Sequence, residues 1–517
     1  MLRLTWYPIM DANRLNGKHP WRHFAQGVPL RALAVIYNQI LSFAAGILVA
    51  RVIGASQYGV VSVARSILEI LGIVSPLGLD LALQRHLGSG SGQDSTRLAQ
   101  LTVFRSVAFV VGIAPAALAA LGLSAYVEQS IYRYPDFAKV LLATLIALPF
   151  VTDLAVLGGA YRGMLKPDPS ILASYVVQPT FRAIVMITLF AFGWRLWAVV
   201  VGTSVSYVVS WIILAVRARR ELAPTGATGG LDWADTLSVL RYSPSLAASL
   251  IFTTCIRSAD SLFLGHFGTA ADVGQYGAVV MVAQLIGLLG SALGQTLGAR
   301  IALCHRNNDI AGMEGLLAEN IRLTSLFSAP VFAAIVFWGD RIDLVLGPTF
   351  AVDASVVSIV AASLLVQTMF QSSGWALSMT GRHLRETGLL GIGLLASVVL
   401  CFALIPGHGQ IGAALAGFIS LSMVNVSRYA VVRSMFGIKH VKLAAIKPIA
   451  WAVAVAGATH LLLRPLDDRT VLFTLFEAVI FVMSFAVSAW FVLVTHQDRE
   501  MIAGLFMPRP LIAGADE

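Results

Sequence analysis

Apolar residues run through most of this chain in stretches of helix length, separated by short polar segments. We count fourteen such stretches, centred near residues 42, 69, 110, 148, 182, 206, 254, 286, 328, 365, 396, 421, 454 and 482. Each is about 20 residues long, the length that an α-helix needs to cross a bilayer, and none alternates like a barrel strand. Because hydrocarbon offers no hydrogen bonds to the backbone, the pattern predicts transmembrane α-helices.

A recurring sequence pattern divides the chain into two halves. The stretch Arg51–Arg85 reads RVIGASQYGVVSVARSILEILGIVSPLGLDLALQR, which we interpret as the end of the first span, a tight glycine-bearing turn and the second span. Its Gln57-Tyr58-Gly59 returns 218 positions later as Gln275-Tyr276-Gly277, again followed by an apolar stretch. The repeat predicts two related bundles, and we expect the first Gln-Tyr-Gly turn at the outer face of the membrane.

Polar segments set the predicted domain boundaries. The segment 217–240 contains Gly, Thr and Pro and falls between spans six and seven, where a flexible linker would join the halves. The predicted fold is an all-α polytopic membrane protein with about 14 transmembrane helices, arranged as two pseudo-symmetric six-helix bundles plus two C-terminal helices. Its parts are a cytoplasmic segment 1–28, bundles 29–216 and 241–437 joined by the linker 217–240, a cytoplasmic loop 438–443, two helices 444–495 and a cytoplasmic tail 496–517.

Composition supports the membrane assignment. The 517 residues are 57% hydrophobic and only 12% charged, with a mean hydropathy of +0.79, which excludes a water-soluble globular protein of this size. The three cysteines, Cys255, Cys304 and Cys401, have no metal-ligand spacing and suggest no disulfide framework. We therefore predict no metal site and no cofactor.

Basic residues predict the topology. An even number of spans places both termini on one side of the membrane, and if that side is the cytoplasm, 24 of the 36 Lys and Arg residues face it or lie at span edges there. This distribution follows the positive-inside rule. A basic cytoplasmic face also accounts for the net charge of +9 without a nucleic-acid partner.

Charged side chains inside spans are the candidate functional residues, because an ionised group at the bilayer centre costs at least ~2.5 kcal/mol. On span two, Arg65 and Glu69 lie four residues apart on one face, and span seven carries a similar Arg and Asp. Since lipid cannot accept these polar faces, we expect spans one, two, seven and eight to turn them toward one shared central cavity. The predicted substrate-binding residues are Arg31, Asn38, Arg65, Glu69, Arg257, Asp260 and Gln284.

Structural explanations compete with this interpretation. Arg65 with Glu69, and Arg257 with Asp260, could be intrahelical ion pairs that only neutralise each other between packed helices. Arg105, near the cytoplasmic end of its span, could snorkel to the interface, and we favour that reading.

Three further intramembrane charges stay open. Asp153 and Arg182 lie mid-span on neighbouring helices, where they could pair with each other, serve the cavity or take part in ion coupling. Glu477 stands alone on the last span, where a protonated carboxyl bonded to a neighbouring helix and a functional group are equally reasonable.

Catalytic motifs are missing from the sequence. It contains no GxxxxGK[ST], HExxH or GxSxG, and its ten histidines have no ligand spacing. We predict that the protein is not an enzyme.

The stretch RVIGASQYG followed by SVARSILEILGIVSPLGLDLALQR resembles bacterial polysaccharide biosynthesis transporters. These are Wzx-type oligosaccharide-lipid flippases of the multidrug, oligosaccharidyl-lipid and polysaccharide exporter superfamily. The resemblance covers residues 30–100 and 240–310 best. It implies two six-helix bundles around a V-shaped cationic cavity, alternating access, and an inner-membrane protein with both termini cytoplasmic. The two extra C-terminal spans also occur in the peptidoglycan-precursor branch of this superfamily.

The implied function is translocation of an undecaprenyl-pyrophosphate-linked oligosaccharide for surface or exopolysaccharide assembly. Arg31, Arg65 and Arg257 would supply positive charge for a pyrophosphate or acidic sugars. Proton or sodium coupling through Glu69, Asp153 or Asp260 stays unassigned, and a polysaccharide polymerase or export machinery is a candidate partner. The alternatives are a multidrug or cation antiporter of the sister family and a membrane glycosyltransferase or polymerase.

Overall fold

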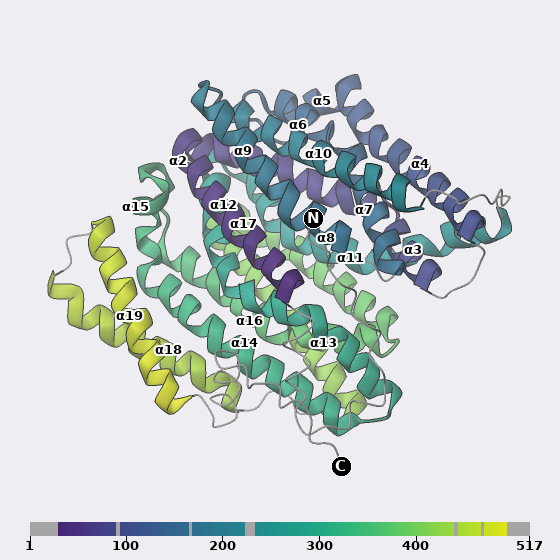
Figure 1. The fold of residues 1–517 in the computed structure, drawn as a ribbon. Helices are drawn as coiled ribbons and strands as arrows, with labels where there is room; N and C mark the ends of the chain where they lie inside the picture. Colours follow the sequence, from purple (N-terminus) through teal and green to yellow (C-terminus); the bar gives the residue numbers. More distant parts are fainter. Residues whose placement is uncertain are drawn as a thin grey trace, which may run out of the picture.

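The computed structural model describes residues 29–88, 94–164, 168–222, 233–438, 443–466 and 470–493. Within these ranges every regular element is a helix (Figure 1). The first half contains α2 (Pro29–Val74), α3 (Leu79–Gly88), α4 (Asp94–Leu118), α5 (Ser124–Ser130), α6 (Phe137–Leu145), α7 (Leu148–Gly163), α8 (Asp168–Leu172), α9 (Gln178–Ala191) and α10 (Leu196–Leu222). The rest of the chain contains α11 (Trp233–Phe267), α12 (Ala270–Ala283), α13 (Leu288–Arg306), α14 (Ile310–Trp338), α15 (Ile342–Leu346), α16 (Ala354–Met379), α17 (His383–Phe436), α18 (Leu443–Leu463) and α19 (Val471–Val492).

Short irregular turns interrupt several of these helices. π-helical turns occupy Ala119–Leu123 and Ala173–Val177, close to Pro115 of α4 and Pro179 of α9. Proline removes a backbone donor and crowds the preceding turn, which accounts for breaks at these places. Short 3₁₀ turns lie at Gln284–Gly287, Gly339–Arg341, Pro348–Phe350 and Arg464–Leu466.

The all-helical membrane fold predicted from the sequence is confirmed. Eleven helices in the described residues are long and apolar enough to cross a membrane. Two of them, α2 with 46 residues and α17 with 54, contain a glycine with non-helical backbone angles, Gly54 and Gly409 respectively. A helix of twice the usual spanning length that breaks at its middle can cross twice, but the count of fourteen spans stays a prediction.

The turn between the first two spans lies at Gly54 and not at Gln57-Tyr58-Gly59. Gly54 has φ 74° and ψ 171°, a conformation that favours glycine, and the helix resumes at once. Both Gln-Tyr-Gly tripeptides are helical, the first in α2 and the second in α12. Our interpretation of the tripeptide as the turn was therefore wrong, because one left-handed residue is enough to break the helix.

Gly59 and Gly274 instead allow close helix packing between the halves. A Cβ atom on Gly59 would lie 1.8 Å from the carbonyl oxygen of Ala270, and one on Gly274 would lie 1.9 Å from that of Ala55. Only glycine allows the α2 and α12 backbones to approach this closely. At the same end, the Arg51 guanidinium donates hydrogen bonds to the carbonyls of Leu344 and Val345.

Two more contacts join the halves. The Tyr134 hydroxyl donates to the carbonyl of Gly265 at 2.7 Å, and burial raises the pKa of Tyr134 well above its ordinary value, so the phenol stays protonated. At the opposite end of the second span, a Cβ atom on Gly78 would lie 2.2 Å from the carbonyl oxygen of Ser243. The two halves therefore meet at both ends of the second span.

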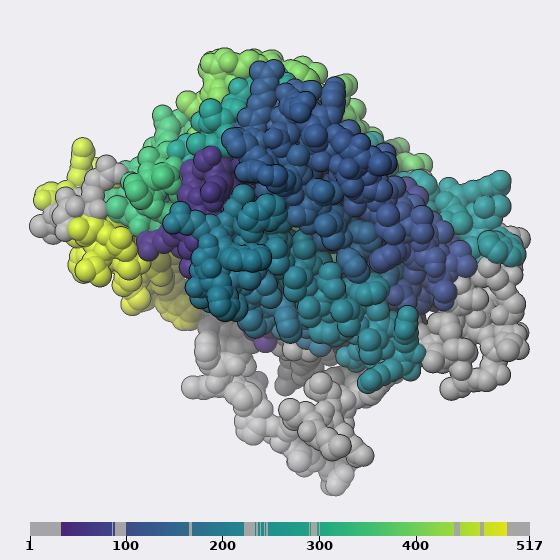
Figure 2. Space-filling model, turned by 90° about the horizontal axis from the view of Figure 1, so that it is seen from above, coloured from purple at the N-terminus to yellow at the C-terminus, as the bar shows by residue number. Residues whose placement is uncertain are grey.

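The last two helices pack on the C-terminal half. α18 lies against α14, and α19 against α18 and α14. Figures 1 and 2 show them at one edge of the molecule, away from α4 to α7 (yellow and blue in Figure 2). Small residues, Ala329 and Ala333 on α14 with Ala452 and Ala456 on α18, let these helices pack closely.

The predicted linker 217–240 is helical where the structure describes it. α10 continues to Leu222 and α11 begins at Trp233, while residues 223–232 lie outside the described residues. The segments 1–28 and 496–517 and most of the loop 438–443 also lie outside them. The domain boundaries stay predictions.

Candidate functional site

A polar cavity lies inside the N-terminal half. Its volume is about 90 Å³, enough for a few water molecules or one small anion. Spans one and two, both in α2, form one wall, and α6, α9 and α10 form the others. The polar lining residues are Ser42, Tyr58, Ser62, Arg65, Glu69, Thr144, Arg182, Thr203 and Tyr207.

Arg182 extends from α9 into this cavity. Its Nη2 donates a hydrogen bond to the Ser42 hydroxyl at 2.8 Å, and Ser42 in turn donates to Asn38 Oδ1 at 3.3 Å. Among the described residues no carboxylate lies within ion-pair distance of Arg182. Its charge is therefore balanced only by hydroxyls and the more distant Glu69.

Arg65 and Glu69 form the intrahelical ion pair that the sequence spacing allows. Arg65 Nε lies 2.8 Å from Glu69 Oε1, and both side chains line the same cavity as Arg182. They remain 62% and 46% exposed, so the pair is not sealed between packed helices. Two guanidinium groups and one carboxylate give the cavity a net positive charge.

The second predicted pair does not form. Asp260 lies inside the C-terminal half, where its Oδ2 accepts a hydrogen bond from the Tyr276 hydroxyl at 2.6 Å and its Oδ1 accepts from the Ser261 N–H at 2.7 Å. Arg257 is exposed and forms no hydrogen bond or ion pair with any described residue. The intrahelical ion pair of Arg257 with Asp260, one of the structural explanations left open, does not form, because the Tyr276 hydroxyl of α12 binds the Asp260 carboxylate instead.

The residues expected around one shared central cavity lie in different parts of this structure, and the shared cavity stays a prediction. Arg65 and Glu69 line the cavity in the N-terminal half, and Asn38 accepts a hydrogen bond from the lining residue Ser42. Asp260 lies within the C-terminal half. Gln284 is exposed in the 3₁₀ turn that breaks the eighth span. Arg31 is in the first turns of α2, and its side chain lies outside what the structure describes.

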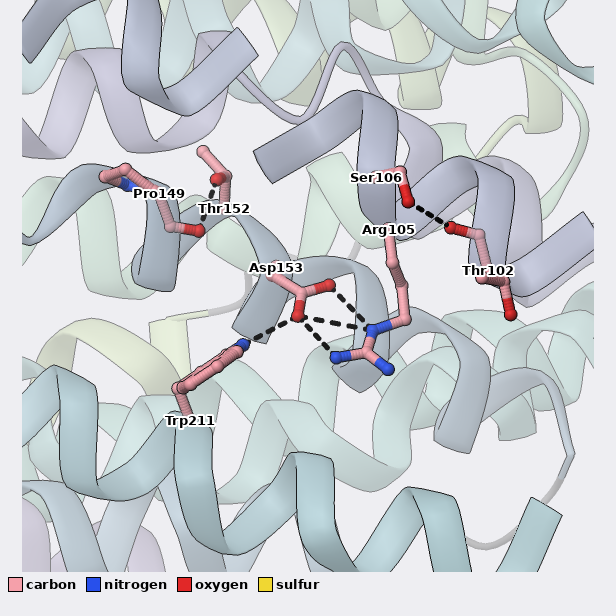
Figure 3. Close-up of polar contacts among 7 residues, drawn as sticks. All are labelled: Thr102, Arg105, Ser106, Pro149, Thr152, Asp153 and Trp211. Carbon is pink, nitrogen blue, oxygen red and sulfur yellow. Dashed lines mark hydrogen bonds and ion pairs between the residues drawn. The ribbon is translucent and has the colours of Figure 1, made fainter. Parts of the chain in front are cut away.

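The Asp153 carboxylate binds Arg105 and Trp211 and not Arg182. Its Oδ2 lies 2.7 Å from Nη2 of Arg105, and its Oδ1 accepts from Arg105 Nε at 2.9 Å (Figure 3). The indole N–H of Trp211 donates to Oδ2 at 2.6 Å. Arg105 therefore does not snorkel, and the pairing of Asp153 with Arg182 was wrong. The cluster joins α4, α7 and α10 and leaves Asp153 outside the cavity.

Breaking the Arg105–Asp153 pair is expected to destabilise the N-terminal half. Asp153→Asn keeps an acceptor for Trp211 but leaves a guanidinium that is only 22% exposed without its charge partner, which should cost roughly 3 kcal/mol. Thermal unfolding of the purified protein in detergent measures this. Arg217→Ala, in a pair exposed at 51% and 36%, is the matched control and should leave the unfolding temperature unchanged. An Asp153→Asn protein as stable as the parent would contradict the prediction.

Sequence reasoning missed the tyrosines and the α10 wall of the cavity. Thr203 and Tyr207 lie four residues apart on an apolar helix, so they share a face. That spacing of polar groups within span six was a usable signal. Tyr58 was assigned to a turn, which hid its position in the cavity wall.

Comparison with solved structures finds the same fold in other membrane proteins. A structure described as lipid II flippase MurJ in an inward closed conformation matches with a TM-score of 0.67 and 13% identity, covering 92% of this chain and 99% of that one. A multidrug resistance MATE family transporter in an inward-facing conformation matches with a TM-score of 0.61 and 12% identity, covering 79% and 98%. At these identities the matches show a shared fold and nothing further.

Sequence comparison gives the family of this chain. Residues 24–297, just over half of the chain, match the family model described as polysaccharide biosynthesis protein, and the chain belongs to this family. A probable low-salt glycan biosynthesis flippase, Agl15 of Haloferax volcanii, is 24% identical over 415 residues, 79% of this chain and 83% of its own. A probable flippase, AglR of the same organism, is 23% identical over 323 residues, 60% of this chain and 63% of its own. The resemblance drawn from Arg51–Arg85 is confirmed at this level.

Proposed function

We propose that the protein is a flippase that moves a lipid-linked oligosaccharide from the cytoplasmic to the outer leaflet. The observation that carries this proposal is the cavity in the N-terminal half, where Arg65 and Arg182 outnumber the single carboxylate of Glu69. The phosphate or pyrophosphate of a lipid-linked glycan must pass through the membrane interior during translocation, and a guanidinium there would give it strong charge-assisted hydrogen bonds. The fold class and the family membership support the same function.

The small cavity would bind only the anionic group of such a substrate. Its volume of about 90 Å³ is far below the ~300–1,000 Å³ typical of sites that enclose a whole small molecule. The glycan itself would then occupy space that opens between the halves as they separate, with Arg257 of α11 as a further unpaired cation. The undecaprenyl pyrophosphate carrier, the bacterial inner membrane and the cytoplasmic termini stay predictions from the sequence.

Charge also separates this proposal from a cation or drug antiporter. A site for cations favours carboxylates that outnumber basic groups, which is the opposite of the balance around Arg182. Asp260 is held by Tyr276, and Asp153 by Arg105 and Trp211, so these carboxylates already have partners. The coupling ion stays unassigned.

Removing the unpaired guanidinium is expected to reduce glycan export. Arg182→Ala should lower flipping of the host's lipid-linked oligosaccharide in proteoliposomes by about 10- to 100-fold, because a hydrogen bond to a charged group contributes about 1.5–3 kcal/mol. Arg182→Lys, which keeps the charge but not the planar fork, should be intermediate.

Surface polysaccharide in the native host lacking the gene gives a second measurement for the same variants. Arg219→Ala, an exposed basic residue at the end of α10, is the control for charge and should complement fully. Membrane abundance is measured in parallel. Full export by a protein lacking both Arg65 and Arg182 would overturn the proposed function of the cavity.

A further inference from the structure

A wide depression lies at the Gly54 end of the N-terminal half, the end that the charge distribution assigns to the outer side of the membrane. Its volume is about 670 Å³, within the ~300–1,000 Å³ range of small-molecule sites. Three separate segments form it: the start of the second span, the loop before α6 and the turn between α9 and α10. Its lining residues are Gln57, Asp136, Gly193, Trp194, Arg195, Leu196 and Trp197.

The turn between α9 and α10 fixes the two tryptophans. Gly193, with φ 81°, ends α9, and its N–H bonds to the carbonyl of Phe190 while the Trp194 N–H bonds to that of Leu189. These two bonds are those of a Schellman motif, in which a left-handed glycine closes the helix. Trp194 is consequently held just outside the helix end, and Trp197 follows in the first turn of α10.

Exposed aromatic surface and polar groups occur together in the depression. Trp194 is 51% exposed and Trp197 38% exposed. Arg195 is exposed and forms no hydrogen bond or ion pair with any described residue. Asp136 is 56% exposed and pairs only with Lys139, at 2.6 Å. The depression therefore offers flat apolar rings with a hydrogen-bond donor and an acceptor beside them.

Gln57 adds a polar group without a partner. Its side-chain oxygen is buried and accepts no hydrogen bond within the described part of the chain. Leaving such an acceptor unsatisfied costs about 1–3 kcal/mol. Rotation of the amide would present it to the depression that Gln57 lines, where a ligand hydroxyl could satisfy it.

The depression borders the seam between the two halves. Gln57 is two residues from Gly59, where α2 crosses α12. The loop that carries Asp136 contacts α11, through the Tyr134 hydroxyl on the Gly265 carbonyl and through His266 Nδ1, 3.0 Å from the Ile131 carbonyl. A ligand that leaves the seam at this end would pass the tryptophans.

We propose that this depression is a docking site for sugar rings of the translocated glycan, with Trp194 and Trp197 as the stacking surfaces. The inference rests on the proposed function and adds a site for the glycan at the end where it leaves. A pyranose ring has one face rich in C–H bonds, which carry partial positive charge and suit the negative face of an indole. Its hydroxyls match Gln57, Asp136 and Arg195, the small number of placed polar groups that orient a ligand in such sites.

Interfacial anchoring is the other role that exposed tryptophans have in membrane proteins. An anchor needs only an apolar ring at headgroup depth and gains nothing from a depression. Here the two rings lie beside the buried Gln57 oxygen, which has no partner among the described residues, and the exposed Arg195 guanidinium, and an anchor requires neither. These groups favour the sugar site.

Saturation-transfer NMR on the purified full chain tests the proposal. The probes are the methyl glycosides of glucose, galactose, N-acetylglucosamine and glucuronic acid. We expect transfer to the ring C–H protons of at least one probe, and affinity for it should fall roughly 2- to 10-fold on Trp194→Ala or Trp197→Ala, the fold-change of about 0.5–1.5 kcal/mol for a ring contact. Trp→Phe at either position should keep part of the affinity. Trp233→Ala, which removes an exposed tryptophan at the start of α11, should change nothing.

The outcomes separate the sugar site from the flippase proposal. If the Trp194→Ala and Trp197→Ala proteins bind the sugar probes as the parent does, the docking site is overturned, whether or not their membrane abundance falls. The two tryptophans would then be interfacial anchors. Lack of transfer to every probe would overturn it equally. Sugar binding that needs these tryptophans, in a protein that flips no lipid-linked oligosaccharide, would support the site and count against the flippase.

Discussion

Glu477→Ala is expected to release the last two helices from the rest of the protein. Glu477 on α19 is fully buried, and its Oε2 lies 2.5 Å from Nη1 of Arg341, which is itself only 3% exposed. The Trp338 indole N–H donates to the same oxygen at 2.9 Å. Removing one partner of a buried ion pair costs about 3–5 kcal/mol, a large part of the ~5–15 kcal/mol that holds a typical domain folded. Thermal unfolding and limited proteolysis in detergent should both show the loss.

Two further variants identify the cause of that loss. Glu477→Gln keeps an acceptor for Trp338 but removes the charge, so it should cost nearly as much as alanine if the ion pair dominates. The double variant Arg341→Met with Glu477→Leu fills similar volume without charge and should recover most of the stability. Stability of Glu477→Ala close to the parent's would rule out a structural role for the pair. Because this pair lies far from the cavity residues, surviving protein should still bind the anionic substrate.

The same pair illustrates what a sequence can and cannot show about intramembrane charge. The sequence pattern identified Glu477 as a carboxylate inside a span but gave it no partner. Its partner Arg341 is 136 positions away and had been assigned to an outer loop. A carboxylate four residues from an arginine, as in Arg65 and Glu69, is predictable because the helix itself sets the distance. Pairs between helices, such as Arg105 with Asp153, depend on packing that hydrophobic periodicity does not encode.

The sequence predicted more of the fold than of the cavity. Apolar stretches of spanning length predicted the helices directly, since backbone hydrogen bonding in lipid leaves few alternatives. The cavity was predicted only in part: Arg65 and Glu69 face it, but the facing wall depends on α9 and α10. The polar faces of α2, which carry Ser42, turn into their own half toward Arg182 of α9, while Asp260 turns toward Tyr276. Which neighbour a polar face meets is decided by the tertiary arrangement of helices.

The contact at Gly59, where α2 crosses α12, shows a third limit of prediction from the sequence. Gly59 belongs to a tripeptide whose repetition suggested two related halves, which stay a prediction, and in the structure Gly59 lies where α2 crosses α12. Its Gln-Tyr-Gly composition suggested a turn, because glycine is common in turns as well as at close helix contacts. Only the distance between the α2 and α12 backbones distinguishes the two uses.

Gly274→Val is expected to force the two halves apart at this crossing and abolish export. A Cβ atom on Gly274 would lie 1.9 Å from the Ala55 carbonyl oxygen, whereas ordinary contact begins at 3.4 Å. The Ala55 carbonyl oxygen is backbone within a helix, so no side-chain rotation can relieve the clash, and α12 must move away from α2 by about 1.5 Å. Valine adds two methyl groups to that Cβ, and the contacts of Arg51 and Tyr134 across the same seam would be strained or lost.

Cysteine accessibility measures that opening. In a background with Cys255, Cys304 and Cys401 replaced, a cysteine at Ala55, which is only 3% exposed, should react slowly with a water-soluble maleimide. With Gly274→Val the reaction should become much faster, because the covering helix has moved. Gly315→Ala on α14 is the matched control, since a Cβ atom there meets nothing within 4 Å and alanine suits a helix better than glycine. If labelling at Ala55 and export both stay unchanged in Gly274→Val, the crossing is not what closes this end of the protein.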